Sequence, residues 1–396
     1  MKVITDPEKI EELLTRGVDK IYPSKDALKE VLLQGKRLKL YQGFDPTGPK
    51  LHIGHMVGLK KLAQWQQMGH QVIFLVGDLT GEIGDPSGKS ESRKMLSREL
   101  VLKNAENYKE QASKLLNFRG ENPVEVKYNS EWLGKMGALD FLKIAGELSV
   151  QQVIKRDLFQ DRIEKGQDLF MNEFLYPVMQ AFDSVAMDVD LEIGGSDQTF
   201  NMLMGRKLMR QAKQKEKFVM TTKLLVDSSG KKIGKTEGNA IALDDDSTRL
   251  FGAIMAFPDE VVTQCFECLT DVPMEEIKKM DIGNPMANKK RLAFEIVKQL
   301  HDEKEAEKAQ QNWGNTFQKK EVPEEMEEIK ANKGQPLSGV LVEAKVLKSK
   351  SEWRRLVEGN GVHDLEKDTT ITDVDLKVEG NLTLKLGKKK FLRILV

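Results

Sequence analysis

The sequence predicts an α/β fold built on a parallel sheet, followed by an all-helical region and a small α+β region. Up to about residue 246, short β-branched apolar runs alternate with helical patterns across short connections, which indicates parallel strands joined by crossover helices. From about 247 to 320 the pattern changes to charged helical periodicity. The last part of the chain begins helical and ends in short alternating strands.

The first strand of the predicted sheet is LKLYQGF, residues 38–44, and the turn DPTGP follows it. A helix is predicted next over 51–68, with Gly69 as its C-cap. The apolar run at 71–78 has the length of a second strand, and a glycine-rich loop follows. The elements expected after this loop are a helix at 95–117, a strand at 124–129, helices at 137–148, 149–165 and 170–187, a strand at 190–195 and a helix at 199–212.

These patterns divide the chain into consecutive parts. Residues 1–246 are predicted to form the α/β domain and residues 247–320 the all-helical domain. Residues 321–336 are highly charged and lack aromatic side chains, so we expect a linker there. Residues 337–396 form a small third domain, which is basic because residues 341–396 carry 12 Lys and Arg against 9 Asp and Glu.

The composition is that of a globular protein of more than one domain. The chain has 396 residues, 39% of them apolar and 31% charged. Its 62 Lys and Arg balance 62 Asp and Glu, which argues against nucleic-acid binding over the whole surface but leaves room for a local basic face. The N-terminus is acidic, and no run of 18 apolar residues occurs, so we expect no signal peptide, no membrane association and a cytoplasmic location.

The two cysteines, Cys265 and Cys268, form a single C-x-x-C. No second pair or nearby histidine completes a tetrahedral site, so neither a zinc site nor another protein-bound metal is expected. Low cysteine usage fits a reducing cytoplasm, and the sequence assigns no role to this pair.

Two of the five histidines, His52 and His55, lie at the start of the predicted helix in the motif LHIGH. At this spacing they share a face, and the N-terminus of a helix presents backbone N–H groups and a positive dipole end. Together these features suit a phosphate group. A bare H-x-x-H is more often structural, but this pair lies just past the carboxyl end of the first parallel strand, where ligands bind in such sheets.

The loop GEIGDPSGKS at 81–90 is close to a nucleotide-binding P-loop but has the wrong spacing. Gly84 and Gly88 enclose three residues instead of four, which excludes a P-loop NTPase. The glycines would still let the backbone approach a ligand closely, or they form an ordinary turn.

Three hydrogen-bonding side chains lie on one stripe of the otherwise apolar helix at 170–187. Tyr176, Gln180 and Asp183 occupy positions i, i+4 and i+7. A buried carboxylate needs polar partners, so the stripe faces either a satisfied structural network or a polar ligand.

Two further segments offer polar groups near the same sheet edge. GGSDQ, residues 194–198, closes a strand with two glycines and then places donors and acceptors suited to ribose hydroxyls. The loop KKIGKT at 231–236 contains Lys232 and Lys235, which could neutralise the charge of a departing pyrophosphate. Each motif is weak alone, because such turns and basic loops are common.

The order of these motifs resembles class I aminoacyl-tRNA synthetases, and more narrowly the bacterial tyrosyl-tRNA synthetases. YQGFDPTGPKLHIGH, GDPSGKS, YPVMQAFDS, GGSDQ and KIGKT follow one another between residues 38 and 240. The C-terminal segment SKSEWRRLVEGNGV with its closing strands is similar to the S4 RNA-binding domain. The resemblance implies a Rossmann-like catalytic domain, a helical anticodon-binding domain and an S4-like domain.

The resemblance also implies a role for each matching residue. In tyrosine binding, Tyr41 and Asp183 would bind the phenolic hydroxyl, and Asp85, Tyr176 and Gln180 would surround the ammonium group. The residues expected to act on the phosphates during catalysis are Thr47, His52, His55, Lys232 and Lys235. The residues expected to bind ATP are Gly43, Asp45, Gly54, Gly195, Asp197, Gln198, Lys232 and Lys235, with Asp197 at the ribose.

The implied activity is tyrosine–tRNA ligation: ATP activates L-tyrosine to tyrosyl-adenylate with release of pyrophosphate, and tyrosine then passes to the 3′ end of tRNA(Tyr). Mg²⁺ would arrive with ATP instead of occupying a site of its own. A pocket built to bind a hydroxyl rejects phenylalanine strongly, and tyrosine-specific synthetases are the standard example of this effect. The family also leads us to expect a homodimer.

Two alternatives share the fold. In a tryptophanyl-tRNA synthetase, the pair Tyr41 and Asp183 would have no phenolic hydroxyl to bind. In a small-molecule adenylyl-forming ligase, the helical domain and the basic C-terminal domain would have no function. The sequence does not indicate which tRNA elements are recognised, where a dimer interface lies, what Lys89 does, or whether the chain has a second RNA-binding role.

Overall fold

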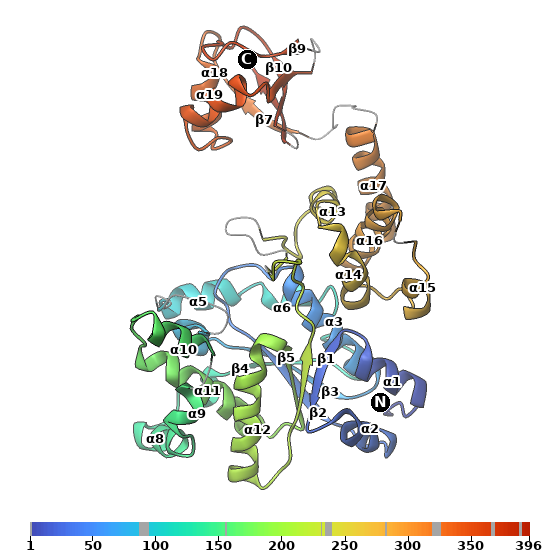
Figure 1. The fold of residues 1–396 in the computed structure, drawn as a ribbon, viewed down its shortest axis with the longest axis vertical. Helices are drawn as coiled ribbons and strands as arrows, with labels where there is room; N and C mark the ends of the chain where they lie inside the picture. The colour runs from blue at the N-terminus through green and yellow to red at the C-terminus, as the bar shows by residue number, and fades with distance from the viewer. Residues whose placement is uncertain are drawn as a thin grey trace. The chain divides into compact units, whose positions relative to one another are not determined.

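The computed structural model describes residues 2–86, 95–154, 157–230, 232–233, 240–281, 283–318, 326–365, 369–387 and 390–396. The chain divides into two compact units, Met1–Glu307 and Lys308–Val396, which are described separately (Figure 1). The first unit contains the α/β region and most of the predicted helical region, so a separate domain beginning at residue 247 stays a prediction.

The first unit is built on a six-stranded sheet in the order β1-β6-β5-β2-β3-β4 (Figure 1). Strands β2 to β6 run parallel, which confirms the predicted parallel sheet. The edge strand β1 is antiparallel to β6, and neither of these strands was predicted. The strands are β1 (Val18–Tyr22), β2 (Lys39–Phe44), β3 (Gln71–Val76), β4 (Glu125–Tyr128), β5 (Leu191–Gly195) and β6 (Phe218–Thr222).

The strand order creates a crevice beside β2. From β2 the chain runs outward through β3 and β4, and it then returns to the other side of β2 to form β5 and β6. Helices that follow β2 and β5 therefore diverge, and ligands of such sheets bind at the carboxyl ends of these strands. The predicted site motifs follow these two strands.

Helix α3 (Ile53–Gln67) follows β2 and confirms the predicted helix at 51–68. Met68 is its C-cap, one residue earlier than expected, and Gly69 follows with a φ of +90°. A Cβ atom at Gly69 would lie 2.8 Å from the carbonyl oxygen of Lys2, so both the conformation and the close approach require glycine.

The single helix predicted at 95–117 is wrong. The structure has two shorter helices there, α5 (Arg98–Ala105) and α6 (Tyr108–Ala112). Three side chains from these helices, Asn104, Tyr108 and Gln111, donate hydrogen bonds to carbonyl oxygens of the turn at 46–49. Both helices therefore hold this turn through side-chain hydrogen bonds.

The helices predicted at 137–148, 170–187 and 199–212 are present, whereas the helices at 7–15, 25–33, 80–83 and 130–133 were not predicted. Helix α11 (Met171–Met187) packs along α12 (Thr199–Lys213), and both correspond to predicted helices. The helix expected at 149–165 corresponds to two helices, α9 and α10. The remaining helices of this region are α1 (Pro7–Thr15), α2 (Lys25–Leu33), α4 (Thr80–Ile83), α7 (Ser130–Leu133), α8 (Ala138–Gly146), α9 (Val150–Ile154) and α10 (Asp157–Glu164).

The region from 247 onward is helical, as the sequence predicts. Arg16, which follows α1, is buried and donates hydrogen bonds to the carbonyl oxygens of Glu267, Thr270 and Val272. This guanidinium group therefore ties the α/β region to the end of α14. The helices are α13 (Ser247–Met255), α14 (Val262–Leu269), α15 (Met274–Lys278), α16 (Pro285–Leu300) and α17 (Glu303–Gln318).

Both cysteines lie on α14 and are buried. Burial raises the pKa of the Cys268 thiol to about 12 and raises the pKa of Cys265 as well, so neither is a reactive thiolate at neutral pH. Their burial within the helical packing accounts for the C-x-x-C spacing.

The second unit carries a five-stranded sheet in the order β7-β11-β10-β8-β9. Its core forms around Trp353. Strand β7 lies inside the segment predicted to be a linker, but it pairs in parallel with β11 at the edge of this sheet. Residues 321–325 of the predicted linker lie outside the described residues. The elements are β7 (Glu327–Lys330), α18 (Leu337–Glu343), α19 (Lys350–Glu358), β8 (Val362–Asp364), β9 (Thr369–Thr370), β10 (Leu382–Leu386) and β11 (Lys390–Leu395).

No helix in the described part of the chain is both long and apolar enough to cross a bilayer.

Candidate active site

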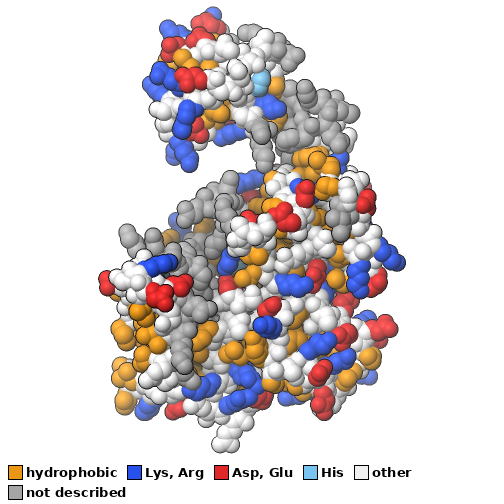
Figure 2. Space-filling model, viewed as in Figure 1, with side chains coloured by type: hydrophobic (Ala, Val, Ile, Leu, Met, Phe, Trp, Pro, Cys, Tyr) orange, Lys and Arg blue, Asp and Glu red, His pale blue; other side chains and the backbone are white. Residues whose placement is uncertain are grey.

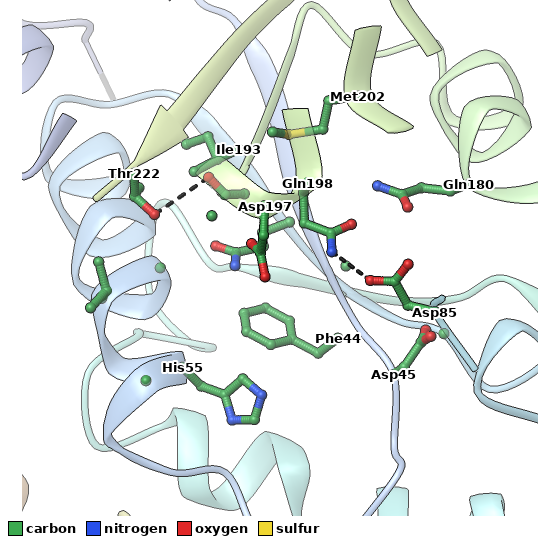
Figure 3. A pocket seen from close by; sticks show the side chains of 18 of the residues that line it. Phe44, Asp45, His55, Asp85, Gln180, Ile193, Asp197, Gln198, Met202 and Thr222 are labelled. Atoms are coloured by element: carbon green, nitrogen blue, oxygen red, sulfur yellow. Dashed lines mark hydrogen bonds between the residues drawn. The ribbon is translucent and has the colours of Figure 1, made fainter. Parts of the chain in front are cut away.

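A cavity of about 390 Å³ opens at the carboxyl ends of β2 and β5 (Figure 3). Lys235, and also Lys89, lie outside the described residues. The other predicted site residues all line this one cavity: Tyr41, Gly43, Asp45, Thr47, His52, Gly54, His55, Asp85, Tyr176, Gln180, Asp183, Gly195, Asp197, Gln198 and Lys232. The structure thus brings together residues that are up to 191 positions apart, from Tyr41 to Lys232.

The two histidines form the start of α3. His52 is the N-cap, and its Nδ1 accepts a hydrogen bond from the backbone N–H of Gly54 at 3.1 Å. The Nδ1 of His55 accepts from the backbone N–H of His52, also at 3.1 Å, and the two rings stack with their centroids 3.8 Å apart. Because Nδ1 is an acceptor in both rings, each neutral imidazole carries its hydrogen on Nε2.

The backbone N–H groups at the start of α3 were expected to bind phosphate, but they donate hydrogen bonds within the chain. The N–H of Ile53 donates to the carbonyl oxygen of Ile241, and the N–H of His55 to that of His52. The first-turn N–H groups of Ile53, Gly54 and His55 therefore have partners within the chain, and the expected phosphate donors at the backbone are engaged. At this helix start, the side chains of His52 and His55 carry the Nε2–H donors.

The opposite end of the cavity is a buried polar site. Tyr41 and Asp183 are both buried there. The carboxylate of Asp183 accepts hydrogen bonds from Trp132 Nε1 at 2.7 Å and from Asn129 Nδ2 at 3.4 Å. Burial raises the pKa of Asp183, and these two N–H donors oppose that rise. Both donors point at an oxygen acceptor, which leaves the group suited to accept a hydrogen from a ligand.

The hydroxyl of Tyr41 belongs to a second buried network. It lies 3.0 Å from Ser184 Oγ, and Ser184 Oγ accepts a hydrogen bond from Lys217 Nζ at 2.8 Å. Lys217 also forms an ion pair with Glu192 of β5. Burial, followed by the neighbouring charge of Glu192, raises the pKa of Tyr41, so its hydroxyl keeps its hydrogen.

Asp45, predicted as an ATP-binding residue, lines the cavity at the end of β2. Its carboxylate accepts hydrogen bonds from the hydroxyl groups of Tyr176 and Thr80, each at 2.8 Å. A Cβ atom at Gly77 would lie 2.0 Å from Asp45 Oδ1, so glycine is needed there. Asp45 thus joins the end of β2 to α11 and orients Tyr176.

One amide–carboxylate hydrogen bond and one ion pair link the segment after β5 to the neighbouring loops. Gln198 points toward Asp85 and donates to its Oδ2 at 2.5 Å (Figure 3). Lys232 Nζ lies 2.6 Å from Asp197 Oδ2, so a residue expected at the phosphates is paired with the residue expected at the ribose. An ATP molecule that uses both groups must separate this pair.

Five residues of the site were not predicted: Asn129, Trp132, Ser184, Glu192 and Lys217. The sequence carries a signal for one of them, because Glu192 is a charged residue within the apolar strand DLEIGG. Asn129 and Trp132 lie together at the start of α7. Their polar atoms, like those of Ser184 and Lys217, reach their partners only in the folded protein.

Comparison with known proteins agrees with this geometry. The family model "tRNA synthetases class I (W and Y)" matches residues 33–318. The tyrosine–tRNA ligase of Aquifex aeolicus is 40% identical over 392 residues, which cover 98% of this chain and 99% of that one. The tyrosine–tRNA ligase of Geobacter metallireducens is 42% identical over 395 residues, or 96% and 97% of the two chains.

Solved structures show the same fold. A C-terminally truncated mitochondrial tyrosyl-tRNA synthetase of Aspergillus nidulans superposes with a TM-score of 0.67 at 26% identity, covering 78% of this chain and 94% of that one. The tyrosyl-tRNA synthetase of Archaeoglobus fulgidus, solved with L-tyrosine, has a TM-score of 0.60 at 20% identity, covering 77% and 100%. At that identity the second likeness concerns the fold alone.

Proposed function

We propose roles for the cavity residues from the premise that this chain belongs to the class I tRNA synthetases and is a tyrosine–tRNA ligase. Its substrates are then L-tyrosine, ATP and tRNA(Tyr). The observation that carries the assignment is one cavity with two unlike ends: the buried hydroxyl-binding pair Tyr41 and Asp183, and the paired imidazoles of His52 and His55. A tyrosine molecule placed between them presents its carboxylate to the phosphates of ATP.

In the first step, the tyrosine carboxylate attacks the α-phosphorus of ATP and pyrophosphate leaves. The carboxylate is already ionised, so the protein needs no general base and contributes positioning and charge stabilisation. His52 and His55 would donate from Nε2 to phosphate oxygens, with Thr47 beside them. Lys232 would leave Asp197 and join Lys235 on the departing pyrophosphate. Mg²⁺ would be bound to ATP as part of the substrate.

At the other end, Asp183 would accept the hydrogen of the substrate phenol and Tyr41 would donate to its oxygen. Asp85, Tyr176 and Gln180 would surround the substrate ammonium. Asp197 and Gln198 would contact the ribose, where Gly43, Gly54 and Gly195 allow close approach. Asp45 would act through Tyr176 and Thr80, since its carboxylate accepts from both hydroxyls.

In the second step the tyrosyl group passes from the adenylate to the 3′ adenosine of tRNA(Tyr). The helices from 247 to 320 would contact the anticodon, and the small second unit would contact RNA as an S4-like domain. A cytoplasmic location is part of this proposal, since tRNA is charged where proteins are made.

The test is pyrophosphate exchange into ATP without tRNA, with tyrosine, tryptophan and phenylalanine supplied separately. We expect exchange with tyrosine only. Exchange with tryptophan, or with none of the three, would contradict the proposal.

A homodimer is the proposed assembly, and an apolar surface on α8 to α11 supports it. Helix α8 has no buried residue, and its Leu139 and Leu142 are 66% and 65% exposed. Val150, Phe170 and Met171 are exposed nearby in the chain, and Figure 2 shows hydrophobic side chains at the surface of this region. An apolar surface of this kind marks an interface with another protein chain.

Light scattering coupled to gel filtration tests this assembly. The wild-type chain should have twice the mass of one chain, and Leu142→Glu should shift it to a monomer. Leu33→Glu is the matched control, because Leu33 is also exposed but lies on α2. A dimer that survives Leu142→Glu would place the interface elsewhere.

A further inference from the structure

Lys217 is a charged residue with no exposed surface. It immediately precedes β6, its side chain is 0% exposed, and it forms an ion pair with Glu192. Burying an ion pair is costly, and the cost is recovered only if the geometry is good and the remaining hydrogens have acceptors. Here the ammonium group has a second acceptor, Ser184 Oγ at 2.8 Å. The position of this group beneath the tyrosine end of the cavity calls for a functional explanation.

We propose that Lys217 is a positioning residue for tyrosine recognition, which fixes the hydroxyl of Ser184 and through it the hydroxyl of Tyr41. This inference rests on the proposed function, because it assumes that Tyr41 contacts the substrate phenol.

The direction of the hydrogen bonds follows from the chemistry of the ammonium group. Lys217 can only donate, so Ser184 Oγ accepts from it and the hydrogen of Ser184 points elsewhere. Tyr41 Oη lies 3.0 Å away and Glu192 Oε2 lies 3.3 Å away. Ser184 can donate to either oxygen, but Glu192 Oε2 already accepts from Lys217 and lies farther away. Lys217 therefore favours donation from Ser184 to the nearer Tyr41 Oη, and Tyr41 then directs its own hydrogen toward the substrate oxygen. Tyr41 and Asp183 then bind the phenol as one donor and one acceptor, and phenylalanine satisfies neither.

The packing around Lys217 confines its ammonium group. A Cβ atom at Gly205 on α12 would lie 2.6 Å from Lys217 Nζ and 3.1 Å from Ser184 Oγ. Glu192 of this ion pair also contacts a residue proposed to bind the substrate ammonium group, because Gln180 Nε2 donates to Glu192 Oε1 at 3.1 Å. Lys217 therefore supports both groups of residues that are proposed to bind tyrosine.

Steady-state pyrophosphate exchange on the full-length protein tests this inference. The variants are Lys217→Met, and Lys217→Met combined with Glu192→Gln, which removes both charges and avoids an unpaired buried carboxylate if the single variant fails to fold. We expect the KM for tyrosine to rise about tenfold or more and the preference for tyrosine over phenylalanine in kcat/KM to fall by a similar factor. The KM for ATP should stay within about twofold of the wild-type value. Lys217→Gln, which keeps a donor, should recover part of the preference.

Lys61→Met is the matched control. Lys61 is also a buried lysine, but its ammonium donates to the carbonyl oxygens of Leu13 and Arg16, away from the cavity. This variant should lower the melting temperature and leave the KM for tyrosine unchanged. The inference is overturned if the Lys217 variants only lower the melting temperature, or if Lys61→Met changes tyrosine selectivity equally. Failure of the wild-type protein to exchange with tyrosine would instead overturn the proposed function, and the inference with it.

Discussion

At the scale of single residues, the site depends on which ring nitrogen of each histidine accepts a hydrogen bond from the protein backbone. His52 and His55 both accept a backbone hydrogen at Nδ1, and this sets Nε2 as the donor in each ring. The LHIGH spacing thus orients two donors before any substrate arrives. Such fixed donors stabilise a transition state without a reorganisation cost.

Replacing His55 by Phe should keep the aromatic ring and remove the Nε2–H donor. We expect kcat for adenylate formation to fall by about 10²- to 10³-fold, the magnitude typical of one lost transition-state donor. The KM for tyrosine should change little, because the phenol end of the cavity is untouched. Burst measurements of adenylate formation check both values. A large rise in the KM for tyrosine with unchanged kcat would assign His55 to ground-state binding.

His70 is a buried histidine whose protonation affects stability. Its Nδ1 accepts from the backbone N–H of Leu38 at 3.1 Å, and its ring packs against Trp65. Burial, with a smaller contribution from the charge of Arg37, lowers its pKa from 6.5 to about 4. The folded state therefore holds His70 neutral, whereas the unfolded chain takes up a proton below about pH 6.5.

Stability should accordingly be lost as the pH falls from 6.5 toward 4. Between pH 7 and pH 5 the pKa values of 6.5 and about 4 correspond to a loss of about 2 kcal/mol in the free energy of unfolding. Urea unfolding at both pH values measures this loss. A His70→Gln variant lacks the titrating group, so its loss over the same range should be smaller by about that amount. Equal losses in the two proteins would contradict the assignment.

At the scale of elements, the helices around the cavity are adapted to what they cover. Helix α12 contains Gly205, although glycine within a helix costs about 1 kcal/mol relative to alanine. The side chain of Lys217 occupies the space that a Cβ atom would need. Helix α13 contains Gly252, where the structure shows no atom within 4 Å of a Cβ position.

The same substitution should therefore have opposite effects in the two helices. Gly205→Ala should destabilise the protein by about 1–3 kcal/mol, because the added methyl group displaces the buried ion pair. Gly252→Ala should stabilise it by about 0.5–1 kcal/mol through helix propensity. Thermal melting of both variants beside the wild type checks the signs. A stabilising Gly205→Ala would show that α12 moves to make room.

At the scale of the whole molecule, amino acid activation and RNA binding are expected to belong to different units. All described residues that line the cavity belong to the first unit, and the second unit has its own hydrophobic core. A chain ending after Gln318 keeps α17 complete. Mitochondrial relatives have been solved in C-terminally truncated form, with 26% identity to this chain.

A chain truncated after Gln318 should keep tyrosine-dependent pyrophosphate exchange within about twofold of the full-length rate. Transfer of tyrosine to tRNA should fall by about tenfold or more, because the basic C-terminal unit is proposed to contact phosphates of the tRNA. Parallel assays of exchange and of tRNA charging measure the two steps. Equal loss of both activities would show that the second unit is needed to build the cavity.

The sequence by itself determined the local elements and the motifs at the sheet edge. Period-2 and period-3.6 patterns predicted β2, α3, β3, α11 and α12, because apolar periodicity reflects which face is buried. Short spacing likewise predicted the pairing of His52 and His55 and the polar stripe of α11. These features depend on residues a few positions apart, and they needed no knowledge of the rest of the chain.

Only the tertiary structure decided which distant polar groups meet. Lys217 and Glu192 are 25 residues apart, and Trp132 and Asp183 are 51 apart. Lys217 meets Glu192 because β6 lies beside β5 in the sheet, whereas Trp132, which follows β4, meets Asp183 of α11. The tertiary structure also determines that the Asp45 carboxylate accepts a hydrogen bond from the hydroxyl of Tyr176. It likewise determines that acceptors within the chain bind the first backbone N–H groups of α3. Burial makes these pairings necessary, because a charge removed from water must find its partner wherever the fold supplies one.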